Sequence, residues 1–180
     1  MQSRTLLPCA ILLAVAIAGC SSSNPTDPES TNNVASVSAE DFNLGIFGDM
    51  AAGKKIEIFA LHPLPMGDNA PASEEESFHG YKILGSAEIQ PAEFFPLLEI
   101  VAQGESENDS MAAACFNPRH GIQVTYEDQS VESLVICFEC LQIYQYKGQE
   151  RTGQHLTSND HSAAVTTIYQ QHGLEIHKGH

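Results

Sequence analysis

Five side chains between Cys115 and Cys140 could do chemistry together. Three are the thiols of Cys115, Cys137 and Cys140, and two are the basic groups of Arg119 and His120. Three thiolates and one imidazole form a Cys₃His set of the kind that zinc binds. A neighbouring guanidinium or imidazole can also activate a thiol for redox chemistry. The third interpretation is structural: buried thiols or one disulfide, with Arg119 and His120 fixing a tight turn, because buried cysteine often behaves as a small apolar residue.

The spacing of the cysteines favours the structural interpretation. In a regular strand, residues three apart face opposite sides and lie ~10 Å apart at ~3.3 Å per residue. A disulfide needs Cα atoms within ~7 Å of each other. Cys137 and Cys140 can therefore join only if the strand bulges, and Cys115 with Cys140 is the better predicted pair. The same geometry weakens a zinc site made of the three thiols and the His120 imidazole. No cofactor is expected, and zinc is the alternative.

A predicted antiparallel hairpin must position these side chains. Residues 121–126 alternate between apolar and polar, which predicts a strand with one buried face. Residues 134–146 are rich in β-branched and aromatic residues and are apolar on both faces in their middle, so they predict one long central strand. Keeping the two apolar rows together pairs Ile122 with Ile136.

Other segments complete the predicted domain around this hairpin. Residues 55–61 and 81–89 have the composition of strands. An apolar stripe at helical spacing predicts a helix that begins near Pro91 and ends before Gly104. A second amphipathic helix is predicted to end at Gly173. The expected fold is α+β, a small antiparallel sheet with a central hairpin packed by about two helices.

Three short motifs carry a resemblance to known proteins. They are CFNPRHGI at residues 115–122, ICFEC at 136–140 and FHGYKILG at 78–85. In combination they resemble a group of uncharacterised bacterial secreted proteins and lipoproteins. The likeness covers roughly residues 55–146 and implies a shared fold, without implying a particular activity.

The N-terminus predicts a lipid anchor. Arg4 and the apolar run 6–17, which is too short to span a bilayer, are typical of a signal peptide. The following sequence, Ile-Ala-Gly-Cys ending at Cys20, resembles the bacterial lipobox, whose cysteine receives acyl chains such as palmitate. Residues 1–19 are therefore the predicted lipoprotein signal peptide. Ser21 resembles the default signal for sorting to the outer membrane.

Charge and composition set the expected function. The net charge is −15, which disfavours nucleic acid as a partner. Residues 20–41 are rich in Ser, Asn and Pro and predict a flexible tether to a single α+β domain at 42–180. We expect a non-enzymatic lipoprotein, held on the outer membrane by acylated Cys20, whose periplasm-facing domain has a binding or envelope-structural role. The alternative is a metal-binding or thiol-redox domain.

Overall fold

A computed structural model describes residues 37–65, 77–107 and 111–178. The predicted signal peptide, the predicted lipidation site Cys20 and most of the predicted tether lie outside these ranges. Within them, no helix has the length and apolar character that crossing a membrane requires.

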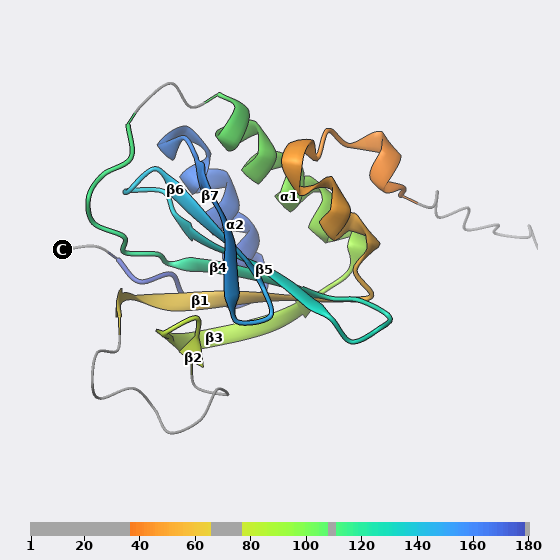
Figure 1. Ribbon diagram of the computed structural model, residues 1–180, viewed down its shortest axis with the longest axis horizontal. Coiled ribbons are helices and arrows are strands. Elements are labelled where there is room, and N and C mark those ends of the chain that lie inside the picture. Colours follow the sequence, from red (N-terminus) through yellow and green to blue (C-terminus); the bar gives the residue numbers. More distant parts are fainter. Residues whose placement is uncertain (1–36, 66–76, 108–110, 179–180) are drawn as a thin grey trace, which may run out of the picture. The chain divides into compact units, whose positions relative to one another are not determined.

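The domain is built on one antiparallel sheet that curls strongly (Figure 1). Its seven strands have the order β2-β3-β1-β4-β5-β6-β7. The α+β class is therefore confirmed, but the predicted small sheet is wrong. The bounds are β1 Lys55–Pro65, β2 Ser77–Phe78, β3 Tyr81–Ile89, β4 His120–Thr125, β5 Val131–Cys137, β6 Gln142–Lys147 and β7 Glu150–Leu156.

Both predicted α-helices are present, and the sequence explains their ends. Helix α1 (Pro91–Ser106) has proline at its start and a capping box between Gln90 and Glu93. Helix α2 (Ser162–Gln171) ends before Gly173, which has a positive φ of 75°. Short 3₁₀ helices complete the chain: η1 (Ala39–Asp41), η2 (Gly45–Ala52) and η5 (Asn159–His161).

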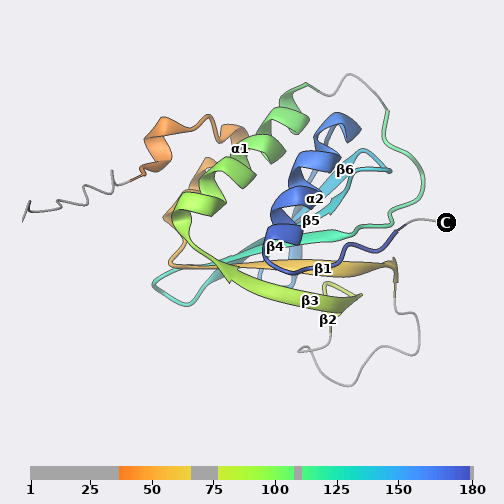
Figure 2. The ribbon, with the colours of Figure 1, turned by 180° about the vertical axis from the view of Figure 1, so that it is seen from behind.

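One face of the sheet carries the main core. Helices α1 and α2 lie across this face and contact each other (Figure 2), and η2 packs against α1. The prediction of about two helices therefore omitted η2. Apolar side chains of β1, β4, β5 and β6 point toward the helices, and burying them provides most of the driving force for folding. The largest of them are fully buried: Ile58, Ile122, Leu134, Ile136 and Ile143.

Gly104 lies inside α1, not beyond its end as predicted. A Cβ atom at this position would lie 2.7 Å from the Thr157 hydroxyl oxygen and 3.3 Å from the His161 ring. The glycine therefore lets the last turns of α1 approach the segment that leads into α2.

The central hairpin is confirmed, but its second strand is shorter than predicted and its register is different. A turn at residues 138–141 separates β5 from β6, so the predicted single strand is wrong. Ile122 pairs with Leu134 instead of Ile136, a shift of two residues. A two-residue shift leaves every side chain on its predicted face, because side chains alternate with a period of two. Burial alone therefore could not distinguish the two registers.

Candidate functional site

The turn after β5 contains a disulfide between Cys137 and Cys140, whose Cα atoms are 5.2 Å apart. The predicted Cys115–Cys140 bond is therefore wrong. The regular strand ends at Cys137, so the ~10 Å separation expected within a strand does not apply. Both half-cystines are buried, with 1% and 0% of their surfaces exposed.

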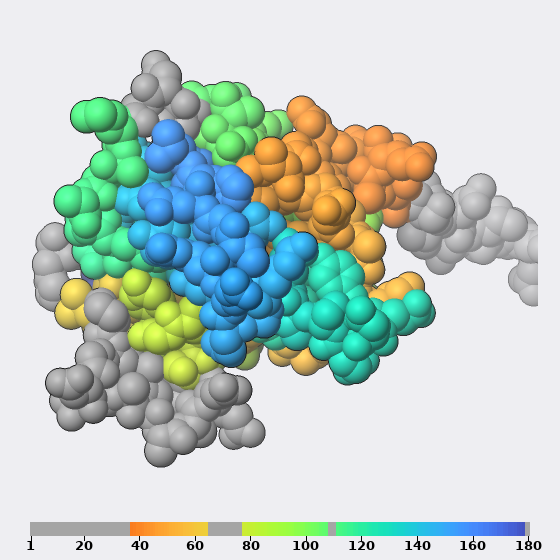
Figure 3. All heavy atoms as spheres, in the orientation of Figure 1, coloured from red at the N-terminus to blue at the C-terminus, as the bar shows by residue number. Residues whose placement is uncertain are grey.

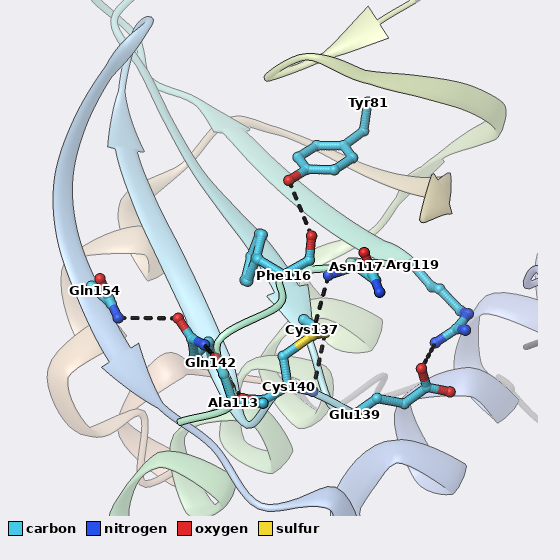
Figure 4. The surroundings of a disulfide bond; sticks show 10 residues. All are labelled: Tyr81, Ala113, Phe116, Asn117, Arg119, Cys137, Glu139, Cys140, Gln142 and Gln154. Carbon is cyan, nitrogen blue, oxygen red and sulfur yellow. Dashed lines mark hydrogen bonds and ion pairs between the residues drawn. A yellow bond between two sulfur atoms is a disulfide. The ribbon is translucent and has the colours of Figure 1, made fainter. Parts of the chain in front are cut away.

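Cys140 also organises the segment before β4 (Figure 4). The Ala113 N–H donates to the Cys140 carbonyl oxygen at 3.0 Å, and the Asn117 N–H donates to the Cys140 Sγ at 3.1 Å. The Gln142 amide donates to the Ala113 carbonyl at 2.6 Å. Cys115 lies between these two attachment points, and its thiol is free and exposed.

The structure does not assemble the predicted zinc ligands. Cys137 and Cys140 are bonded to each other, so neither offers a thiolate in this oxidised form. Over residues 37–65, 77–107 and 111–178, no group of three or more His, Cys, Asp or Glu side chains is placed to hold a metal ion.

His120 points into the helix-covered core, where only 3% of it is exposed. Its Nε2 lies 3.2 Å from the Thr166 hydroxyl, and the rings of Phe138 and Tyr169 meet it edge to face at 5.4 and 4.9 Å. Burial, helped by the nearby charge of Arg119, lowers the pKa of His120 to about 3. The imidazole is therefore neutral near pH 7 and packs as a core side chain.

The side chain of Arg119 lies beside the disulfide turn. Its backbone is held between two strands, because its N–H donates to Ile136 at 3.3 Å and its carbonyl accepts from Leu61 at 3.0 Å. Its guanidinium Nη1 lies 2.8 Å from the carboxylate of Glu139 (Figure 4). The side chain of Arg119 is 13% exposed and that of Glu139 is 57% exposed. The structure thus places Arg119 and His120, neighbours in sequence, in two different environments.

The face of the sheet opposite the helices carries aromatic side chains, which we call the aromatic layer. Phe116 stacks on Tyr144 with ring centroids 3.8 Å apart, and Tyr81 approaches Phe116 at 6.2 Å. The Tyr81 hydroxyl donates to the Phe116 carbonyl at 3.4 Å. Arg151 lies 4.6 Å above the Tyr144 ring, a cation–π contact. The layer consists of Phe59, Phe78, His79, Tyr81, Phe116, Tyr144 and Tyr146.

His79 closes the aromatic layer at the turn between β2 and β3. It has a positive φ of 49°, which is uncommon for a residue other than glycine. Its ring stacks on Tyr146 at 3.7 Å, and its Nε2 lies 2.7 Å from the Ser133 hydroxyl. Burial lowers the pKa of His79 to about 4. These contacts bring the β2–β3 end of the sheet against β5 and β6, although four strands lie between β2 and β6 in the sheet order.

A cleft of about 540 Å³ lies beside His79 on this face. In the space-filling view, the atoms of β6 and β7 (blue) lie next to those of β3 (yellow-green) on this side of the molecule (Figure 3). The cleft combines apolar rings with hydroxyl, amide and carboxylate groups. Its lining includes Phe59, Phe78, His79, Glu57, Gln123 and Gln149.

A buried carboxylate was also missed from the sequence. Glu132 is 5% exposed and accepts hydrogen bonds from the Tyr126 hydroxyl at 2.7 Å and the Gln145 amide at 2.6 Å. Gln145 in turn lies 3.0 Å from the His155 ring. Because its carboxylate has these two donors inside the domain, we interpret Glu132 as part of a structural network.

The sequence held one signal for the aromatic layer. Tyr144 and Tyr146 are two residues apart on one strand, so they share a face. The other members come from distant segments, and these include the FHGY and CFNP parts of the motifs noted above. The resemblance itself stays a prediction. Comparison of the chain with protein-family models, with curated proteins and with solved structures finds no match.

Proposed function

We propose that this protein is a bacterial lipoprotein, anchored in the outer membrane by acylated Cys20, whose domain faces the periplasm and binds a ligand or partner without catalysing a reaction. The observation that carries the proposal is the buried Cys137–Cys140 disulfide. Disulfides form and persist in oxidising compartments such as the periplasm, and are rare in the cytosol. A buried disulfide that also positions a neighbouring segment is a structural element, which supports an exported protein.

The aromatic layer supports a binding role. A cleft of about 540 Å³ falls within the range of small-molecule sites, which are mostly apolar with a few polar groups. The ionisable groups at this cleft are already engaged. His79 contacts Ser133 at 2.7 Å, and the Glu57 carboxylate lies 2.8 Å from the Lys55 ammonium. Because Ser133 is fully buried, its hydroxyl is not placed to react with a bound molecule, which favours binding over catalysis by this His–Ser pair.

The anchor is tested by replacing Cys20 with alanine in cells. The wild-type protein should incorporate a palmitate analogue and sediment with outer membranes. Cys20→Ala should lose the label and either stay unprocessed or become soluble. The matched control is Cys115→Ala, which removes an exposed cysteine that we do not expect to be acylated. A processed Cys20→Ala protein that remains on the membrane would contradict the proposal.

A further inference from the structure

A small cavity beside the disulfide turn has a different character from the aromatic cleft. It measures about 310 Å³, close to the lower end of the range for small-molecule sites. One side is polar, with Arg119, Glu139 and Asn117, and the other combines two imidazoles with apolar groups. The second side is formed by His62, Pro63, Leu64 and His177.

We propose that this cavity binds a small organic carboxylate, which pairs with the guanidinium of Arg119. The chain has eight Lys and Arg residues against 23 Asp and Glu, so a positive group largely buried in a cavity wall is unusual for this molecule. Guanidinium is also the side-chain group whose geometry best matches a carboxylate.

Glu139 satisfies only part of the hydrogen-bonding capacity of the Arg119 guanidinium. Glu139 contacts Nη1, but the buried Nε of Arg119 has no hydrogen-bond acceptor among residues 37–65, 77–107 and 111–178. Arg–carboxylate pairs are strongest when two N–H groups donate to the two oxygens. A buried donor without an acceptor is unfavourable, and a second carboxylate would relieve it once the guanidinium turns so that Nε faces the cavity.

A ligand carboxylate can displace Glu139 from Arg119 at a low cost in free energy. Its side chain is 57% exposed, so its carboxylate can be hydrated when it leaves Arg119. Ion pairs with an exposed partner contribute little to stability. Its negative charge nevertheless repels an incoming anion. Glu139 therefore acts as an internal competitor, and removing its charge should strengthen ligand binding.

The walls indicate which carboxylate fits. The rings of His62 and His177 meet edge to face at 5.0 Å. Leu64 is 58% exposed at the cavity, so it presents an apolar surface to whatever enters. Because apolar walls exclude water, they strengthen a charge-assisted hydrogen bond. The volume and walls fit a carboxylate with a small apolar substituent, such as an amino acid whose amine is masked in a peptide bond.

The probes are N-acetylalanine and its uncharged amide, which differ only at the carboxylate. Binding is followed by ligand-observed NMR with the full-length protein in a nonionic detergent. The wild-type protein should bind the acid and not the amide. Arg119→Gln and Arg119→Lys should weaken binding about tenfold or more, because a charge-assisted pair is lost or loses its fork geometry. Glu139→Gln should tighten binding by about three- to tenfold, since the competing charge is gone.

The matched control is Arg151→Gln, the same change at an exposed arginine over Tyr144, which should leave binding unchanged. Equal binding of acid and amide would overturn the proposal. So would a loss of binding in Glu139→Gln similar to that in Arg119→Gln, because a purely structural ion pair predicts that result. Near-UV circular dichroism checks that each variant is folded. If the arginine variants unfold, the binding measured for Glu139→Gln still tests the proposal. This proposal does not depend on the lipid anchor.

Discussion

The disulfide makes a quantitative prediction about stability. Replacing Cys137 and Cys140 together by alanine should lower the free energy of unfolding by about 3 kcal/mol. Closing a loop of about four residues restricts the unfolded chain by about 2 kcal/mol at 25 °C. A further ~1 kcal/mol comes from the Asn117 N–H, which loses the Cys140 sulfur as its acceptor. Reducing the wild-type protein should cost about 2 kcal/mol only, because the sulfur of Cys140 is still present.

Urea unfolding followed by circular dichroism measures both changes. With an m-value of about 2 kcal/mol/M, a loss of 3 kcal/mol lowers the midpoint by about 1.5 M. The control is Cys115→Ala, an exposed and unpaired site that should change stability by less than ~0.5 kcal/mol. A Cys115→Ala variant destabilised as much as the double variant would refute the reasoning, as would identical midpoints for the oxidised and reduced wild type.

Two further predictions concern the stability contributed by residues of the core. Between pH 7 and pH 5 the wild type should lose about 2 kcal/mol more stability than His120→Gln. The reason is that the folded pKa of His120 is about 3, whereas the unfolded imidazole takes up a proton near pH 6.5. The stability that the neutral His120 contributes is present above pH 6.5 and is lost as the pH falls toward 3. Urea midpoints of both proteins at pH 7 and pH 5 measure this loss. Equal losses of stability in the wild type and in His120→Gln would contradict the prediction. Gly104→Ala should destabilise the domain by about 1–3 kcal/mol in thermal or urea unfolding, because its Cβ would lie 2.7 Å from Thr157. Gly48→Ala, whose Cβ meets nothing within 4 Å, is the matched control and should be close to neutral.

The predictions made from the sequence were most accurate for elements whose local signals agree. The apolar stripe and proline of α1, and the glycine after α2, specify both helices with short-range physics. The strand predicted at residues 81–89 matches β3 in both bounds. Each of these elements has its own periodicity and end signals, so no distant contact is needed to identify it.

The predictions failed where distant contacts or a covalent bond decide the structure. The turn at residues 138–141 has no Gly, Pro, Asn or Asp, and Leu141 adopts a positive φ of 58° there. A disulfide joins the two residues that flank Phe138 and Glu139, and it lies within this unusual turn. The composition of the segment alone indicated a continuous strand. The aromatic layer was missed because its members meet only when the sheet curls.

The most direct test of the account is mass spectrometry of the protein purified from membranes. We predict an N-terminal peptide that begins at Cys20 and carries acyl chains, together with a tryptic peptide over residues 120–147 in which Cys137 and Cys140 resist alkylation until the protein is reduced. A mature protein whose N-terminus is not Cys20, or whose Cys20 is unmodified, would contradict the proposal that this domain is a lipid-anchored component of the envelope.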